Sequence, residues 1–187
     1  MRVISGEFKG RKLEQIEGME IRPTSDRVKE SLFNILGRRL IDCTFLDLFA
    51  GTGGIGIEAY SRGAALVVFN DQSAQSIKVL KSNLDKLNIS DKVEVFNTDY
   101  LNAINRLGND KKKFDIIFID PPYLKGYEKN ALVQISEFNM LAEDGIIVVE
   151  HDLKDKMPEL GGNFKLTRQN KYGNTMISFY GLTLTEG

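Results

Sequence analysis

The glycine-rich stretch from Phe45 to Gly56 constrains the fold more than any other segment of this chain. It begins with a mostly apolar run, which is typical of a central parallel strand covered on both faces. Gly51, Gly53 and Gly56 follow at the G-x-G-x-x-G spacing. Glycines at this spacing permit a tight turn, close approach of the backbone to a ligand and close packing of the next helix. The stretch therefore predicts a strand, a loop and a helix, with backbone N–H groups facing a polar cofactor.

The same spacing also occurs in strand-to-helix turns that bind no ligand. Asp47 argues for a ligand, because it lies at the carboxyl end of an otherwise apolar strand, where a carboxylate costs free energy unless it binds something. Asp71 lies twenty residues after Gly51, where dinucleotide folds place the acid that binds ribose hydroxyls. The alternative for Asp71 is a simple cap on the helix expected from Ser73 to Asn88.

Strands and helices alternate along the rest of the chain. After the opening strand we expect strands at residues 65–70, 93–96, 114–119, 145–150, 164–172 and 175–184, and helices that end near residues 39, 62, 88, 107 and 141. The first of these helices is expected to be capped by Thr24 or Ser25. Residues 1–16 alternate around Gly6 and Gly10, which predicts a β-hairpin. The expected fold is α/β: a mostly parallel seven-stranded sheet with an antiparallel C-terminal edge hairpin, plus a small N-terminal β-hairpin.

Composition limits the class of protein. The 187 residues suit one domain, which we expect to consist of an N-terminal hairpin extension (1–20) and a core (21–187). No apolar run approaches eighteen residues, so we expect no membrane span and a cytoplasmic location. Cys43 and His151 are the only residues of their types, which excludes an internal disulfide, a cysteine zinc cluster and metal sites made of histidine pairs, and we expect no metal. Cys43 is expected to be buried, and His151 to lie on the surface or at a hinge.

Charge is distributed unevenly along the chain. Residues 1–40 hold nine Lys/Arg against six Asp/Glu, whereas the whole chain has a net charge of −1. The expected hairpin carries Arg2, Lys9, Arg11 and Lys12, which suggests a surface that approaches nucleic acid. An ordinary solvated face explains this small excess equally well.

The tetrapeptide Asp120-Pro121-Pro122-Tyr123 follows the strand expected at 114–119. Two successive prolines stiffen the backbone and remove two N–H donors, so acceptor groups stand beside an aspartate and an aromatic ring. A planar NH₂ group on a nucleobase needs such surroundings, with acceptors for its hydrogens and a ring for stacking. The alternative is a proline-stiffened turn without a ligand.

These motifs together resemble those of class I S-adenosylmethionine-dependent methyltransferases that modify exocyclic amines. The N-terminal segments resemble more specifically the bacterial RsmD family, which methylates N2 of a guanine in small-subunit (16S) ribosomal RNA. The matching segments are Arg2–Gly6, Gly10–Leu13, Arg22–Val28, Leu32–Leu36, Val149–His151 and Tyr172–Thr175. One departure is Asn70-Asp71-Gln72, where the family commonly has an apolar residue, glutamate and a basic residue. Aspartate is shorter by one methylene but can still accept from ribose hydroxyls.

The resemblance implies a Rossmann-like fold with S-adenosylmethionine at the carboxyl rim of the sheet and no metal. Asp120, Pro121, Pro122 and Tyr123 would be the catalytic residues. The residues expected to bind the cofactor are Arg22, Thr24, Asp47, Phe49, Gly51, Gly53, Asp71, Gln72, Asp99 and Tyr100. The expected partner is ribosomal RNA, either free or within a small-subunit assembly particle, and the protein is expected to be a monomer.

Three other interpretations of the function remain open. Asp-Pro-Pro-Tyr segments also serve enzymes that methylate adenine N6 in nucleic acid or glutamine in proteins. A nicotinamide-dependent oxidoreductase shares the glycine loop and Asp71, but leaves Asp47 and the proline pair without a purpose. A non-catalytic RNA-binding module is favoured only by the basic N-terminal segment.

Overall fold

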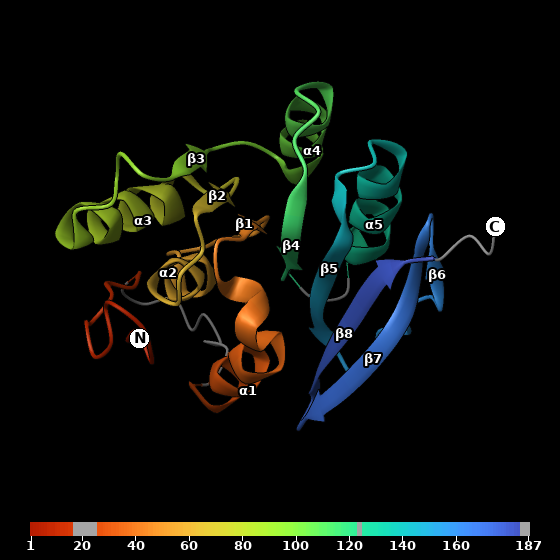
Figure 1. Cartoon of the computed structure of the whole chain (residues 1–187), viewed down its shortest axis with the longest axis horizontal. Coiled ribbons are helices and arrows are strands. Elements are labelled where there is room, and N and C mark those ends of the chain that lie inside the picture. Colours follow the sequence, from red (N-terminus) through yellow and green to blue (C-terminus); the bar gives the residue numbers. More distant parts are fainter. Residues whose placement is uncertain (17–25, 123–124, 184–187) are drawn as a thin grey trace. The chain divides into compact units, whose positions relative to one another are not determined.

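The structure is a computed structural model, and it describes residues 1–16, 26–122 and 125–183. The chain divides into two compact units, Met1–Thr98 and Asp99–Gly187. Each unit combines helices with strands (Figure 1). Among the described helices, none is long and apolar enough to cross a membrane.

The first unit is a small parallel sheet with its helices. Its elements are α1 (Asp26–Leu36), the 3-10 helix η1 (Gly37–Leu40), β1 (Thr44–Asp47), α2 (Gly54–Ser61), β2 (Leu66–Asn70), α3 (Ala74–Leu87) and β3 (Glu94–Phe96). The strand β2 lies in the middle and pairs in parallel with both β1 and β3. The loop between β1 and α2 follows β1, and β2 runs parallel to β1, so this loop lies at the carboxyl ends of both strands. The helix α2 then packs on β1 and β2.

The second unit has one parallel strand pair and an antiparallel C-terminal part. Its elements are α4 (Tyr100–Asn109), β4 (Phe114–Ile119), α5 (Tyr127–Glu137), β5 (Leu141–Asp152), β6 (Leu160–Gly161), β7 (Phe164–Tyr172) and β8 (Thr175–Leu182). β4 pairs in parallel with β5, and β5, β8, β7 and β6 follow in antiparallel order. The predicted alternation and the closing antiparallel hairpin are confirmed.

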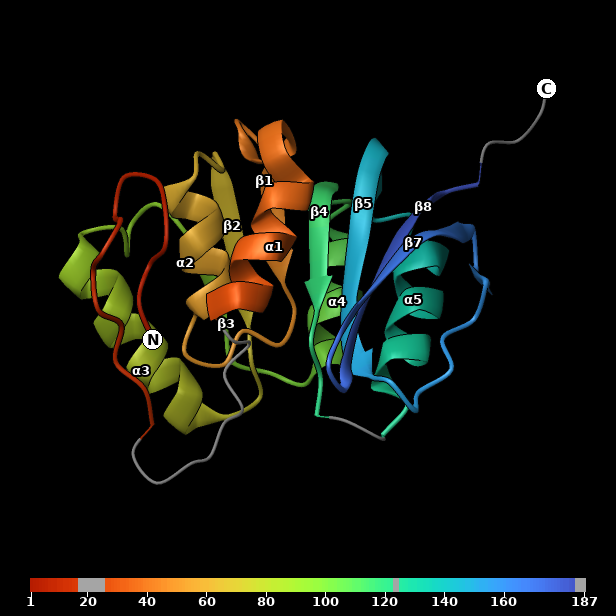
Figure 2. The same cartoon turned by 90° about the horizontal axis from the view of Figure 1, so that it is seen from below.

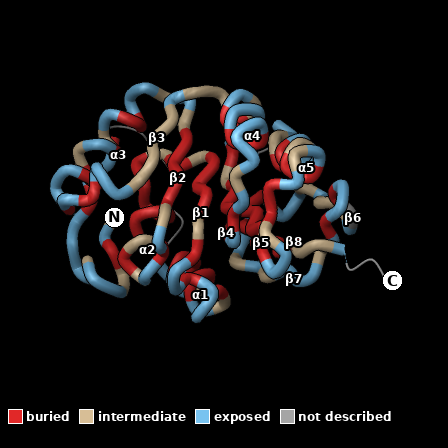
Figure 3. Tube along the Cα trace, turned by 45° about the horizontal axis from the view of Figure 1, so that its top comes forward, coloured by how far each residue is buried: buried red, intermediate tan, exposed pale blue. Residues whose placement is uncertain are grey.

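Burial follows the apolar strand sequences. The tubes of β1, β2, β4 and β5 are largely buried, whereas α1, α3, α4 and α5 expose one side and α2 is buried along almost its whole length (Figure 3). In β1 and β2, Phe45, Leu46, Val67 and Val68 are fully buried, because a parallel strand has both faces covered. Cys43 is also buried, as predicted.

The N-terminal segment (residues 1–16) differs from the predicted β-hairpin. Its two arms run antiparallel, with hydrogen bonds between Val3 and residues 10 and 11, but a single bridge, Arg2 with Lys12, is the only strand-like pair in the described segment. The reason is that the N–H groups of Ile4 and Ser5 donate to the Glu58 side chain instead of across the hairpin. In both views the segment lies beside α2 and α3 (Figures 1 and 2).

Three further expectations were wrong in detail. The helix expected to reach residue 141 ends at Glu137, because Asn139 adopts a left-handed conformation (φ 49°) and Leu141 already begins β5. The two-residue strand β6 is additional to the seven predicted strands. His151 is buried, and its Nε2 lies 2.8 Å from the Ser178 hydroxyl oxygen.

Candidate functional site

The loop between β1 and α2 has the conformation that its glycines predict. Gly51 and Gly53 have φ angles of 55° and 90°, in the left-handed region that favours glycine. The N–H of Gly51 donates to Asp71 Oδ2 at 2.8 Å. A β-carbon on Gly51 would meet no atom within 4 Å, so the space beside this glycine is open. This loop can therefore accept a ligand close to its backbone.

Gly56 has a different function, within α2. A β-carbon at this position would lie 2.2 Å from the ring of Phe69, a buried residue of β2. Side-chain atoms do not approach so closely, so any larger residue would push α2 away from the sheet. The predicted close packing of the helix at the third glycine is confirmed.

Asp47 is a buried carboxylate at the end of β1. Its side chain is 1% exposed, and its Oδ2 accepts from the Gly56 N–H at 2.9 Å. Burial is the main cause that raises the pKa of Asp47 from 3.8 to about 7; the hydrogen bond from Gly56 opposes this shift, and the charge of Asp71 adds to it. A cation bound nearby would stabilise the ionised form.

Asp71 connects the glycine loop to the start of α3. One carboxylate oxygen accepts from Gly51 N and the other from Ser73 N, each at 2.8 Å. The cap of α3 is Ser73, whose hydroxyl accepts from Ser76 N, so Asp71 is not the capping residue that one reading expected. Each oxygen keeps a second lone pair with which it can accept from a ligand hydroxyl. Gln72 is exposed beside it.

Asn70 is a residue of this region that sequence reasoning missed. It is 1% exposed, its Nδ2 donates to Leu48 O at 3.1 Å, and its backbone oxygen accepts from Ala50 N. Its Oδ1 is buried and has no hydrogen-bond partner within the described residues. Through these two hydrogen bonds, Asn70 at the end of β2 fixes the turn after β1. Phe49, in that turn, is half-buried.

In the second unit, Asp99 and Tyr100 begin α4. The Asp99 side chain caps this helix by accepting from Leu101 N at 2.8 Å. Tyr100 is 6% exposed, its hydroxyl accepts from Asn130 Nδ2 at 3.1 Å, and its ring lies 5.2 Å from that of Tyr127. Burial raises the pKa of Tyr100. Its side chain is thus occupied within the unit.

The segment Asp120-Pro121-Pro122 follows directly on β4, as predicted. Asp120 is half-buried, Pro121 is buried and Pro122 is exposed. The carboxylate thus stands at the carboxyl end of a strand with neighbours that have no N–H groups. Three predicted site residues, Arg22, Thr24 and Tyr123, lie outside the described residues, as do the expected caps Thr24 and Ser25.

The four basic residues of the N-terminal segment are exposed. Arg2 Nε lies 3.7 Å from Asp26 Oδ2, and an Arg11 guanidinium nitrogen donates to the backbone oxygen of Lys86. Lys9 and Lys12 are exposed as well. Their side chains are accessible to a polyanion.

Beneath this segment lies a buried charge cluster that the sequence did not reveal. Glu58 is fully buried and accepts from the N–H groups of Ile4 and Ser5 at 2.8 and 3.0 Å. Its carboxylate also lies 3.2 Å from Lys29 Nζ and 2.8 Å from Arg62 Nε. Lys29 Nζ donates in turn to Arg2 O at 2.7 Å. The cluster fixes the backbone of the N-terminal segment on α1 and α2.

Comparisons with known proteins show the family to which this chain belongs. A family model described as "Conserved hypothetical protein 95" matches residues 1–181. Ribosomal RNA small subunit methyltransferase D of Escherichia coli (strain K12) is 32% identical over 180 residues, which cover 96% of this chain and 89% of that protein. This chain belongs to the RsmD family of methyltransferases. The family resemblance inferred from the motifs is confirmed.

Two further proteins, named a putative rRNA methyltransferase and a putative methyltransferase, are similar to this RsmD-family chain over nearly its whole length. YlbH of Bacillus subtilis (strain 168) is 43% identical over 180 residues, covering 96% of this chain and 98% of that protein. The solved structure of yhhF from Escherichia coli has a TM-score of 0.87 and 31% identity, with 99% of each chain covered. The fold is therefore the Rossmann-like class I methyltransferase fold that the sequence predicted.

Proposed function

We propose that this chain transfers a methyl group from S-adenosylmethionine to N2 of a guanine in small-subunit (16S) ribosomal RNA. The observation that carries the proposal is Asp120-Pro121-Pro122 at the carboxyl end of β4, in a chain of the RsmD family. In this proposal residues 1–187 act as one methyltransferase domain, residues 1–20 are its N-terminal extension, and ribosomal RNA is the partner.

The first unit fits the chemistry of S-adenosylmethionine. This cofactor carries a sulfonium and an ammonium group, and the buried Asp47 carboxylate offers a charge of opposite sign. Gly51 leaves open space for close approach, and Asp71 keeps acceptor capacity for ribose hydroxyls. Asp47, Gly51, Gly53 and Asp71 would hold the cofactor. Further contacts are proposed for Arg22, Thr24, Phe49, Gln72, Asp99 and Tyr100.

The bound cofactor would supply an electrophilic methyl group on sulfur. The guanine amine is a poor nucleophile, because its lone pair is delocalised into the ring. The Asp120 carboxylate and the Pro121 carbonyl would accept hydrogen bonds from the two N–H groups of this amine. These bonds would favour a pyramidal nitrogen whose lone pair points at the methyl carbon. Formation of the new N–C bond would accompany cleavage of the S–C bond, and Asp120 or water would take the surplus proton. Positioning and exclusion of water account for most of the expected rate gain, and Tyr123 would stack on the base.

An assay with tritiated S-adenosylmethionine and 16S ribosomal RNA from a strain lacking this protein tests the proposal. The wild-type protein should label the RNA, and nuclease digestion with chromatography should identify N2-methylguanosine. Asp120→Ala should bind the cofactor with unchanged affinity by calorimetry, while methyl transfer falls by about 10²-fold or more, because a positioned acid–base group contributes this much. Full activity of Asp120→Ala would refute the role of this residue.

The identity of the product separates the proposal from its alternatives. N6-methyladenosine in the digest would favour an adenine enzyme, and labelling of protein instead of RNA would favour a glutamine enzyme. RNA binding without any methyl transfer would favour the non-catalytic module. Binding of a nicotinamide cofactor in preference to S-adenosylmethionine would favour an oxidoreductase.

A further inference from the structure

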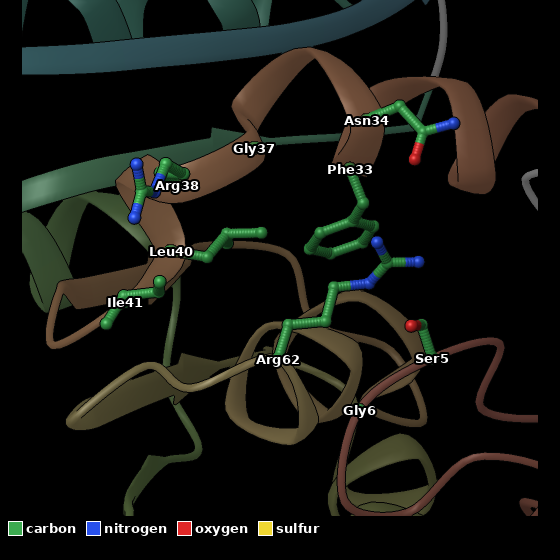
Figure 4. A pocket seen from close by; sticks show the side chains of 9 residues that line it. All are labelled: Ser5, Gly6, Phe33, Asn34, Gly37, Arg38, Leu40, Ile41 and Arg62. Atoms are coloured by element: carbon green, nitrogen blue, oxygen red, sulfur yellow. The ribbon is translucent and has the colours of Figure 1, made fainter.

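A cavity of about 360 Å³ opens in the first unit between the N-terminal segment, α1 with η1, and the end of α2. Phe33 and Arg62 point toward one another within it, Arg38 lies on one side, and Ser5 and Asn34 lie on the other (Figure 4). A volume of this size lies within the range of small-ligand sites, roughly 300–1,000 Å³.

The Arg62 side chain is held rigidly at this cavity. Its Nε donates to Glu58 Oε1 at 2.8 Å, and its guanidinium carbon lies 4.9 Å from the centroid of the Phe33 ring. The side chain is 14% exposed, and in the described part of the chain its two terminal nitrogens make no further hydrogen bond. A planar donor fixed in this way recognises phosphate without further loss of side-chain entropy.

The charge around the cavity is positive. Glu58 is shared by Lys29 and Arg62, so these three side chains together carry one positive charge in excess. Arg38 adds a second at the exposed edge, and its guanidinium pairs with no acid among the described residues. The residues that line the cavity include no Asp or Glu. A partly buried excess of positive charge favours an anionic occupant.

We propose that this cavity binds one nucleotide of the substrate RNA other than the target guanine. Its phosphate contacts Arg38 and the free donors of Arg62. The Asn34 amide and the Ser5 hydroxyl can form hydrogen bonds with the ribose or the base. The side chain of Ile41, a residue that is 56% exposed, can pack against the apolar face of the base. The cavity adjoins the N-terminal segment that carries Lys9 and Arg11, so it extends the basic RNA surface.

Within the first unit, the cavity is separate from the glycine loop proposed to hold the cofactor. Ile41 precedes β1 and Arg62 follows α2, so both lie at the amino ends of the parallel strands, whereas the glycine loop follows the carboxyl end of β1. The four residues of β1 span roughly 13 Å. A nucleotide here is therefore a recognition contact that fixes the register of the RNA, and this inference rests on the proposed function.

Arg38→Glu tests the inference, with Lys165→Glu as a control that makes the same charge change on exposed β7. Binding of a 16S ribosomal RNA transcript is measured by fluorescence anisotropy over a series of salt concentrations. Arg38→Glu should raise the Kd for the RNA about tenfold and lower the slope of log Kd against log salt concentration by about one. Lys165→Glu should leave the Kd within about twofold of the wild-type value and the slope unchanged. Asn34→Asp should weaken binding in the same direction.

Methylation kinetics distinguish recognition from a structural defect. Arg38→Glu should raise KM for the RNA while kcat and the affinity for S-adenosylmethionine stay at wild-type values. An unchanged KM, or a loss of cofactor affinity, would overturn the inference, and so would tight binding of GMP or AMP that RNA does not displace. If the wild-type protein binds this RNA through Arg38 but transfers no methyl group to it, the proposed function fails and the nucleotide site remains.

Discussion

At Asp47, the needs of folding and of binding oppose one another. Its carboxylate is buried at the end of β1 and has a pKa of about 7 instead of 3.8. The folded protein therefore binds a proton at this site more tightly than the unfolded chain does. The contribution of Asp47 to the free energy of unfolding therefore decreases as the pH rises from about 4 to 7, and it stays reduced at higher pH.

Asp47→Asn should therefore stabilise the protein without cofactor at pH 8, by up to roughly 4 kcal/mol if the whole pKa shift is relieved. Asparagine keeps an oxygen that can accept from the Gly56 N–H. The same variant should bind S-adenosylmethionine more weakly, because it offers no charge to the cationic end. Urea unfolding at pH 5 and pH 8 and calorimetric titration check both effects. A variant that is less stable than the wild type at pH 8 would contradict this account.

At the scale of elements, the packing of α2 on the sheet depends more on Gly56 than on Gly54. Gly56→Ala should destabilise the protein by about 1–3 kcal/mol, because the new methyl group meets the buried Phe69 ring. Gly54→Ala should change stability by about 1 kcal/mol or less, because its methyl group meets the flexible end of the Met1 side chain. Urea denaturation of both variants provides the measurement. Equal effects would show that ring contact is not the cause.

Boundaries of elements were predicted well where a residue enforces them locally. Phe114–Ile119 is a strand with the expected ends, and Gly63 ends α2 with a φ of 109°. The end of α5 was missed, because Asn139 rather than glycine or proline stops the helix. The N-terminal hairpin was overestimated, because the partner of its N–H groups is Glu58, more than fifty residues away. Local patterns carry no information about such a partner.

At the scale of the whole molecule, a net charge of −1 does not itself favour RNA. Binding must then depend on local basic groups. Reversal of Lys9, Arg11 and Lys12 to Glu should weaken binding of 16S ribosomal RNA and lower its salt slope by up to about three, since each lost phosphate contact removes about one. Filter binding at several salt concentrations provides the measurement.

Reversal of Lys156, Lys165 and Lys171, which are exposed in the second unit, is the matched control. It makes the same change in net charge. If both triple variants lose affinity equally, RNA is attracted by net charge alone and the N-terminal segment has no special role.

The sequence predicted the class of fold, the glycine loop after β1 and the position of Asp120-Pro121-Pro122 directly after β4, because these depend on local signals: apolar runs, glycine spacing and a proline pair. The roles assigned to the site residues stay predictions. The sequence did not predict the residues that hold these parts in place. Asn70 looked like a departure from the family, and no sequence motif includes Lys29 or Glu58. Their roles arise only when segments distant in sequence meet, which periodicity cannot describe.

The anchoring of the N-terminal segment by Glu58 has a consequence for evolution and design. Glu58 accepts hydrogen bonds from the backbone N–H groups of residues 4 and 5. These bonds do not depend on which side chains those two residues carry. The tip of the segment can therefore change its amino acids while its attachment persists. Phe8 also attaches the segment, because its ring stacks on Tyr60 of α2. Exchange of residues 9–12 between relatives should therefore yield folded proteins with altered RNA preference.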